Sequence, residues 1–201
     1  MTTIVVIGPP GAGKGTRIQK AIAEEVIPNL KHISTGNLLR KKGIDTSSGK
    51  LVSDDLIMEI LKEELESIEK DSVVILDGVP RTMEQANLMQ QYGIQVDKVV
   101  YLPVTEEEAV RRAEQRIICP NCQQAYTLDG FKPPKVKGIC DTCGVNLVKR
   151  PDDNAETAKK RLEIYKTATE PLIDFFKNNN ITVSEVATTE PFDVFINLLA
   201  N

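Results

Sequence analysis

The sequence predicts an α/β fold in which a five-stranded parallel sheet is flanked by helices. Two observations lead to this prediction. Short apolar runs alternate along the chain with longer helical patterns, the order that gives parallel strands covered on both faces. The first apolar run also leads straight into a glycine-rich loop, Gly8–Thr16, of the kind that joins a buried strand to a helix. Ligands of such sheets bind beyond the carboxyl ends of the strands.

Five apolar runs are the expected strands, and helical patterns lie between them. One helix is expected to open at Ser53, which is followed by two acids and then by apolar residues on one face. Another opens at Thr105, which has capping-box spacing to Glu108, and runs to about Arg116. The expected strands are Thr3–Ile7, His32–Ser34, Ser72–Leu76, Lys98–Leu102 and Ile181–Ser184.

The loop has the sequence of a phosphate-binding loop and indicates that the chain binds a nucleotide. Its glycines let backbone N–H groups close around phosphates, and the helix that begins near Lys14 directs its positive end toward them. Lys14 adds a mobile charge. Gly15 stands where a Ser or Thr usually follows the lysine, and Thr16 comes one position later. An ordinary Gly-Pro turn would rarely match so many positions.

Two segments interrupt the alternation of strands and helices. Lys41–Lys50 is polar and rich in turn residues, so we expect a loop between two helices. Ile117–Asp153 contains all four cysteines and the Pro133-Pro134 pair, and we expect it to be a small inserted module.

Composition excludes several classes of protein. With 201 residues and a net charge of −4, the chain can bury a large core but lacks the positive balance of nucleic-acid-binding proteins. No apolar run has the roughly 20 residues of a membrane helix, and Met1 leads into the first strand without a signal segment. We therefore expect a cytoplasmic protein without nucleic-acid or membrane partners. His32, the only histidine, is expected to be structural.

The cysteines form two C-x-x-C pairs, and 17 residues separate Cys122 from Cys140. This spacing is typical of four-cysteine zinc sites, in which the ion is structural because no coordination position stays open. Two disulfides or four unrelated thiols are the alternatives, and a cytosolic setting disfavours disulfides. The predicted zinc ligands are Cys119, Cys122, Cys140 and Cys143.

The scarcity of histidine favours a reaction that needs no general base. Phosphoryl transfer between two nucleotides fits, because the acceptor phosphate is already anionic and positioning with charge neutralisation carries the catalysis. Arginine suits this task, since its guanidinium binds phosphate oxygens in pairs and stays protonated. Six arginines fall at element ends or module edges, although each alone could be an ordinary surface residue: Arg40, Arg81, Arg112, Arg116, Arg150 and Arg161.

Together these motifs resemble the adenylate kinases, specifically the bacterial type with a long, zinc-containing lid. The resemblance covers nearly the whole chain. It implies a P-loop kinase that reversibly transfers the γ-phosphoryl of Mg-ATP to AMP as a monomer. Besides the cysteine pairs, the matching segments are Gly8–Thr16, Ser34–Arg40, Lys50–Asp54, Leu76–Arg81, Arg150–Asn154 and Arg161-Leu162.

The resemblance assigns roles by position. ATP would be held by Gly11, Ala12, Gly13, Lys14, Gly15, Thr16, Arg112 and Arg116, with Arg112 against the adenine. AMP would be held by Thr35, Arg40, Val52, Gly78, Arg81, Gln85, Arg150 and Arg161, with Thr35 and Gln85 reading its base. Lys14, Arg81, Arg116, Arg150 and Arg161 would be catalytic. Asp77, Asp152 and Asp153 would orient waters around Mg²⁺, which the nucleotides hold in place of a hydroxyl at Gly15.

The implied domains are a core (1–33, 53–116 and 154–201), a shortened acceptor-binding region (34–52) and a zinc-bound lid (117–153). Asn37, Val79 and Gln115 replace the family's usual Asp, Phe and Gly. Val183–Pro191 does not reproduce the usual adenine-contacting loop, so no site residue is expected there. The alternatives are a kinase of another nucleoside monophosphate and a catalytically silent nucleotide-binding regulatory module.

Overall fold

The computed structural model describes residues 1–44, 52–128, 133–150 and 153–200. Five parallel strands form the main sheet in the order β2-β3-β1-β4-β7, which confirms the predicted sheet. The edge strand β2 begins two residues before the expected position, because Leu30 and Lys31 pair with β3 although they do not continue its apolar run. The strands are β1 (Thr2–Ile7), β2 (Leu30–Ser34), β3 (Val73–Asp77), β4 (Lys98–Tyr101) and β7 (Thr182–Glu185).

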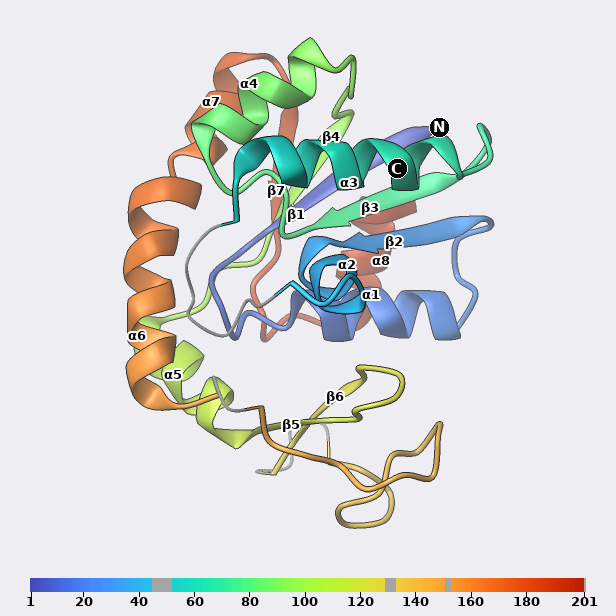
Figure 1. Cartoon of the computed structure of the whole chain (residues 1–201), viewed down its shortest axis with the longest axis vertical. Coiled ribbons are helices and arrows are strands. Elements are labelled where there is room, and N and C mark those ends of the chain that lie inside the picture. Colours follow the sequence, from blue (N-terminus) through green and yellow to red (C-terminus); the bar gives the residue numbers. More distant parts are fainter. Residues whose placement is uncertain (45–51, 129–132, 151–152, 201) are drawn as a thin grey trace.

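Alternate residues of β1 pack against opposite layers of helices. Val5 and Ile7 share a core with α3 (Asp54–Glu66), α4 (Met83–Gln91) and α7 (Leu172–Asn178), whereas Ile4 and Val6 share one with α1 (Lys14–Ala23) and α8 (Phe192–Ala200). Figure 1 shows the two layers on opposite sides of the sheet. Burying each of these β1 side chains contributes roughly 1.5–3 kcal/mol, so β1 is firmly held where the phosphate loop leaves it.

The N-termini of α3 and α5 (Glu106–Gln115) lie where the sequence predicts them. Ser53 is the residue before α3, although its side chain makes no capping bond. Thr105 Oγ1 accepts a hydrogen bond from the Glu108 N–H at 3.3 Å. The Glu108 carboxylate does not complete the capping box, because it binds the guanidinium groups of Arg111 and Arg112 on its own helix.

The cysteine-containing segment forms a small structure of its own, which lies apart from the main sheet (Figure 1). Strands β5 (Arg116–Ile118) and β6 (Ala125–Thr127) pair antiparallel. Among its described residues, the buried cluster consists of Ile117, Tyr126 and two cysteines, with Cys143 and Leu147 packed against them. So small a core needs further stabilisation.

Two further helices complete the described fold. The short α2 (Thr35–Lys41) follows β2, and a turn at residues 42–44 leads toward the expected loop, of which residues 45–50 lie outside the described part. Helix α6 (Ala155–Ile164) packs beside α5 and continues into a π-helical turn, Tyr165–Thr169. In the described ranges, no helix combines the length and apolar character needed to cross a membrane.

Candidate active site

The phosphate loop leaves β1 at the carboxyl edge of the sheet and enters α1 at Lys14. The Lys14 ammonium donates hydrogen bonds to the carbonyl oxygens of Gly8 at 2.6 Å and Pro9 at 3.1 Å. Gly11 has φ of +85°, and a Cβ there would lie 2.7 Å from the Ala109 carbonyl oxygen, so only glycine fits. The loop therefore packs against α5 while its cationic side chain stays within the loop.

Lys14 and Asp77 form the electrostatic centre of the site. Burial lowers the pKa of Lys14 to about 8; Asp77 opposes this effect, and the charges of Arg81 and Arg116 add to it. Burial raises the pKa of Asp77, but the hydrogen bond from His32 and the charge of Lys14 outweigh burial, so this pKa lies below its ordinary value. Asp77 is therefore a carboxylate at neutral pH.

His32 supports Asp77 from the adjacent strand. Its Nε2 lies 3.3 Å from Asp77 Oδ2, and its side chain is 10% exposed. The pairing of β2 with β3 brings the two residues together, since Ser34 lies opposite Asp77 and His32 is two residues earlier on the same face. This contact agrees with the structural role expected for the single histidine.

Gly15 faces the same carboxylate. Apart from its chain neighbours and the backbone of its own helix, the described atom that a Cβ built at Gly15 would meet within 4 Å is Asp77 Oδ2, at 3.7 Å, an ordinary van der Waals contact. The position usually taken by a Ser or Thr hydroxyl is thus open space between the phosphate loop and Asp77. Such space next to an ionised carboxylate suits water around a cation.

A cleft of about 370 Å³ runs from the phosphate loop to α4 and to the cysteine-containing segment. Most of the predicted nucleotide-binding residues line it, although they come from elements far apart in the sequence. They are Gly11, Gly13, Lys14, Gly15, Thr16, Thr35, Arg40, Val52, Asp77, Gly78, Arg81, Gln85, Arg112, Arg116, Arg150 and Arg161. Ala12 lines an adjoining cavity.

Hydrogen bonds order the end of the cleft between α2 and α4. Thr35 Oγ1 donates to the Gly78 carbonyl at 2.9 Å, and Arg81 Nε donates to the same oxygen at 2.8 Å. Gly78 has φ of +88°, and a Cβ there would lie 2.8 Å from Thr35 Oγ1, so a side chain is excluded. Arg40 donates to the Asn37 side-chain oxygen. The Gln85 side chain is buried.

Arg116 and Asp153 form a bidentate ion pair across the base of the cysteine-containing segment. Arg116 Nε donates to Asp153 Oδ2 at 2.9 Å, and Arg116 Nη2 donates to Oδ1. The Asp153 side chain is 1% exposed, whereas that of Arg116 is 25% exposed. This ion pair joins Arg116, which is predicted to contact the transferred phosphoryl group, to Asp153, which is predicted to lie near Mg²⁺. Asp152 lies outside the described residues.

The four cysteines are free of disulfides, and their sulfur atoms all lie within 4.8 Å of one another. Tetrahedral zinc with bonds of about 2.3 Å places its sulfur ligands about 3.8 Å apart, and Cys122 Sγ lies 3.7 Å from Cys140 Sγ. The N–H groups of Cys122 and Cys143 donate to the sulfurs of Cys119 and Cys140, each at 3.4 Å. The donor set and its spacing fit one zinc ion.

Comparisons with known proteins agree with this geometry. The family model described as adenylate kinase matches residues 6–181. The chain is 37% identical to an adenylate kinase of Clostridium tetani, over 97% of this chain and 95% of that protein. It is 38% identical to one of Caldicellulosiruptor saccharolyticus, over 94% of each. An adenylate kinase of Streptomyces coelicolor is 37% identical, over 94% of this chain and 93% of that protein.

The chain belongs to the adenylate kinase family. It is therefore an enzyme, a nucleotide-binding kinase of the class that transfers phosphoryl groups between ATP and AMP. The resemblance drawn from the motifs and the P-loop kinase fold are confirmed, and the free cysteine cluster fits the zinc-containing type.

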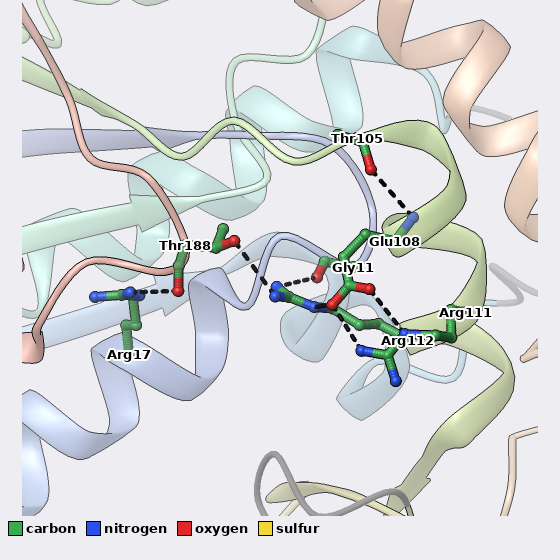
Figure 2. Close-up of polar contacts among 7 residues, drawn as sticks. All are labelled: Gly11, Arg17, Thr105, Glu108, Arg111, Arg112 and Thr188. Atoms are coloured by element: carbon green, nitrogen blue, oxygen red, sulfur yellow. Dashed lines mark hydrogen bonds and ion pairs between the residues drawn. The ribbon is translucent and has the colours of Figure 1, made fainter.

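A second cavity, of about 920 Å³, adjoins the phosphate loop beside Arg112. Arg112 donates to the Gly11 carbonyl and to Thr188 Oγ1, each at 3.3 Å, while Glu108 Oε1 accepts from Arg112 Nε at 2.6 Å. Hydrogen bonding with Arg111 lowers the pKa of Glu108 to about 2; burial opposes this shift and Arg112 strengthens it. Figure 2 shows Arg112 between Glu108 and Thr188.

The structure also brings Arg17 and the loop between β7 and α8 to this cavity, which the sequence analysis did not predict. Arg17 Nη2 donates to the carbonyl oxygens of Thr188 at 3.0 Å and Glu190 at 3.1 Å. Figure 2 shows it approaching Thr188 from α1, on the other side from Arg112. The signal was available, because Arg17 lies three residues after Lys14, about one helical turn further along α1.

Proposed function

We propose that the enzyme transfers the γ-phosphoryl group of Mg-ATP to AMP, reversibly giving two ADP, and that cationic side chains without a general base carry the catalysis. The observation that supports this proposal is the gathering of cations from seven elements or loops around one cleft. They are Lys14, Arg40, Arg81, Arg112, Arg116, Arg150 and Arg161.

The proposed mechanism uses these charges at successive places along the cleft. Lys14 and the loop amides bind the ATP phosphates, whereas Arg40 and Arg81 hold the phosphate of AMP. Arg116, Arg150 and Arg161 neutralise the charge that spreads over the transferred group, and such preorganised charges act most strongly where water is excluded. The AMP phosphate attacks as an anion, so no side chain has to remove a proton.

Magnesium would be bound mainly by the nucleotide phosphates and by water. When bound, it supplies charge neutralisation between the two phosphate chains. Asp77 is the described residue best suited to hold its waters, because it is ionised and faces the open space beside Gly15. Asp152 and Asp153 complete the proposed set. Zinc at Cys119, Cys122, Cys140 and Cys143 would stabilise the segment without entering the reaction.

We further propose that residues 34–52 bind AMP and that residues 117–153 close over the phosphates as a lid, each moving against the core (1–33, 53–116 and 154–201). Closure would exclude water that competes with AMP for the phosphoryl group. A cytoplasmic monomer without nucleic-acid or membrane partners remains the expectation.

Acceptor choice tests the proposed reaction. Formation of ADP from ATP is measured by a coupled assay with AMP, CMP, UMP and GMP, and AMP is expected to give the highest kcat/KM. A ranking with AMP last would replace the proposal by a kinase of another nucleoside monophosphate.

Substitution of Arg116 tests the catalytic mechanism. Arg116→Ala should lower kcat by roughly 10²–10³-fold, the usual effect of losing one transition-state contact, whereas ATP binding measured by calorimetry should change only a few-fold. A silent regulatory module would show negligible turnover in the wild-type protein as well. An unchanged rate in Arg116→Ala would contradict the proposed role of Arg116.

A further inference from the structure

The Gln85 side chain is buried at the acceptor end of the cleft, with 2% of the residue exposed. Its amide oxygen accepts a hydrogen bond from the backbone N–H of Arg81 at 2.7 Å. Its amide nitrogen donates to Asp54 Oδ1, also at 2.7 Å. Asp54 is the first residue of α3, so this contact joins the N-termini of two helices that pack against each other.

These two partners determine the direction of the amide. An ionised carboxylate only accepts hydrogen bonds, and a backbone N–H only donates them. A reversed amide would place its N–H groups against the Arg81 N–H and its oxygen against the Asp54 carboxylate, so it would lose both bonds. The orientation therefore follows from the chemistry of the partners as well as from the coordinates.

Within the described residues, the same arrangement leaves Gln85 one side-chain donor to offer a ligand. The amide nitrogen carries two N–H groups, and Asp54 accepts only one of them. The backbone of Gln85 is also held, because its N–H donates to Thr82 Oγ1 at 3.1 Å, the cap of α4. Nearby, the Thr35 hydroxyl proton is directed at the Gly78 carbonyl, which leaves the Thr35 oxygen with its lone pairs as an acceptor.

We propose that Asp54 is a specificity-determining positioning residue, which directs the Gln85 amide so that its second N–H selects the acceptor base. This inference rests on the proposed function, in which AMP occupies this end of the cleft. Adenine has a ring-nitrogen acceptor next to its amino group, whereas guanine and uracil have a ring N–H next to a carbonyl. A base with a ring N–H would meet the N–H of Gln85 donor to donor. Rejection then comes from a buried donor left unpaired.

Two matched variants, Asp54→Ala and Asp55→Ala, test the proposal. Both remove one acid from the first turn of α3, and Asp55 is an exposed residue that forms no hydrogen bond with Gln85 in the described part of the chain. We measure the ratio of kcat/KM for AMP to that for GMP, together with KM for ATP and the melting temperature. Asp54→Ala should lower the ratio about ten-fold through KM for AMP, with KM for ATP within about two-fold of the wild-type value. Equal ratios in the two variants would overturn the proposal.

A double variant keeps the test decisive if Asp54→Ala does not fold. In Asp54→Asn with Gln85→Glu, the new Asn donates to the new carboxylate, which still accepts from the Arg81 N–H. The hydrogen bond from the Arg81 N–H keeps its direction and the bond between positions 54 and 85 is reversed, but position 85 has no donor left for the base. The ratio of kcat/KM for AMP to that for GMP should fall by about ten-fold or more, because the carboxylate at position 85 and the ring nitrogen of adenine are both hydrogen-bond acceptors. A wild-type ratio in this folded variant would overturn the proposal.

The acceptor preference of the wild-type enzyme distinguishes failure of the proposed function from failure of the role of Asp54. If AMP is not its preferred acceptor, the proposed function fails before Asp54 is considered. If AMP is preferred and Asp54→Ala behaves like Asp55→Ala, only the role of Asp54 fails.

Discussion

Lys14 shows how one residue combines two opposing demands of a phosphate site. Burial in the cleft excludes water, which strengthens its attraction to phosphates, but burial also lowers its pKa to about 8, compared with 10.5 for an ordinary lysine. Below pH 8 the side chain is mostly a cation, and above pH 8 it progressively becomes a neutral amine. Bound phosphates favour the cation and raise the pKa again.

This shift predicts a pH profile for the free enzyme. At low ATP concentration, kcat/KM for ATP should be level up to about pH 7.5 and should fall about ten-fold for each pH unit well above 8, as Lys14 loses its proton. Initial rates from pH 6 to 10 measure it. At saturating ATP the fall should begin at a higher pH. A profile that stays level to pH 9.5 would show that Lys14 keeps its charge in the free enzyme.

The residues of the site differ in how much of their surroundings could be predicted from the sequence alone. A role for Lys14 could be proposed from the sequence because it depends on neighbours within the loop. The contacts of Gln85 and His32 are with Asp54 and Asp77, which are 31 and 45 positions away. The sequence contains no local signal for such pairs, since folding alone brings them together.

Among the elements, α1 and the loop between β7 and α8 act together through Arg17. One guanidinium nitrogen binds two carbonyl oxygens of the loop, and Arg112 binds the Thr188 hydroxyl from α5. Three elements thus hold one wall of the cavity beside the phosphate loop. In the proposed function ATP phosphates occupy the loop, so we expect this wall to influence ATP rather than AMP.

Replacing Arg17 should therefore affect one substrate selectively. Arg17→Gln should raise KM for ATP about three- to ten-fold, because the loop carbonyls lose a charged donor, and should leave KM for AMP within about two-fold. Steady-state kinetics with each substrate varied in turn measures both constants. Lys31→Gln, which removes the same charge from an exposed position on β2, is the control. Equal effects on both substrates would indicate a general loss of structure instead.

The elements themselves were largely predictable. All five predicted runs became strands; the central strands β1, β3 and β4 have the branched apolar residues that a parallel strand buried on both faces needs, whereas β2 and β7 lie at the edges of the sheet. The start of β2 was wrong by two residues, because strand pairing with β3 extends it beyond its apolar run. Only half of the expected capping box formed, because Arg111 and Arg112 compete for Glu108.

At the scale of the whole molecule, the large sheet and the cysteine-containing segment differ in the size of the apolar core that stabilises them. The sheet has two apolar cores, one on each face, whereas the segment has a cluster of a few side chains around its cysteines. Its stability should therefore depend on the metal. The Arg116–Asp153 pair joins this segment to the core at the cleft.

Zinc removal tests this dependence. The purified protein should contain about one equivalent of zinc, and its removal by a thiol reagent with a chelator should abolish phosphotransfer while far-ultraviolet circular dichroism stays largely helical. The Cys140→Ser variant should melt several degrees lower than the wild-type protein and should not retain zinc. The control variant Thr142→Ala, which changes a neighbouring residue that is not a cysteine, should keep both the melting temperature and the zinc. Full activity in metal-free protein would contradict a structural zinc.

Taken by itself, the sequence determined the sheet, the phosphate loop, the cysteine pairs and the family, because each is a pattern of neighbouring residues or of fixed spacings. The tertiary structure alone decided which polar groups meet: Gln85 with Asp54, His32 with Asp77, Arg116 with Asp153, and Arg17 with Thr188. Hydrogen-bond direction and charge pairing act over about 3 Å, and only the folded chain brings distant residues that close.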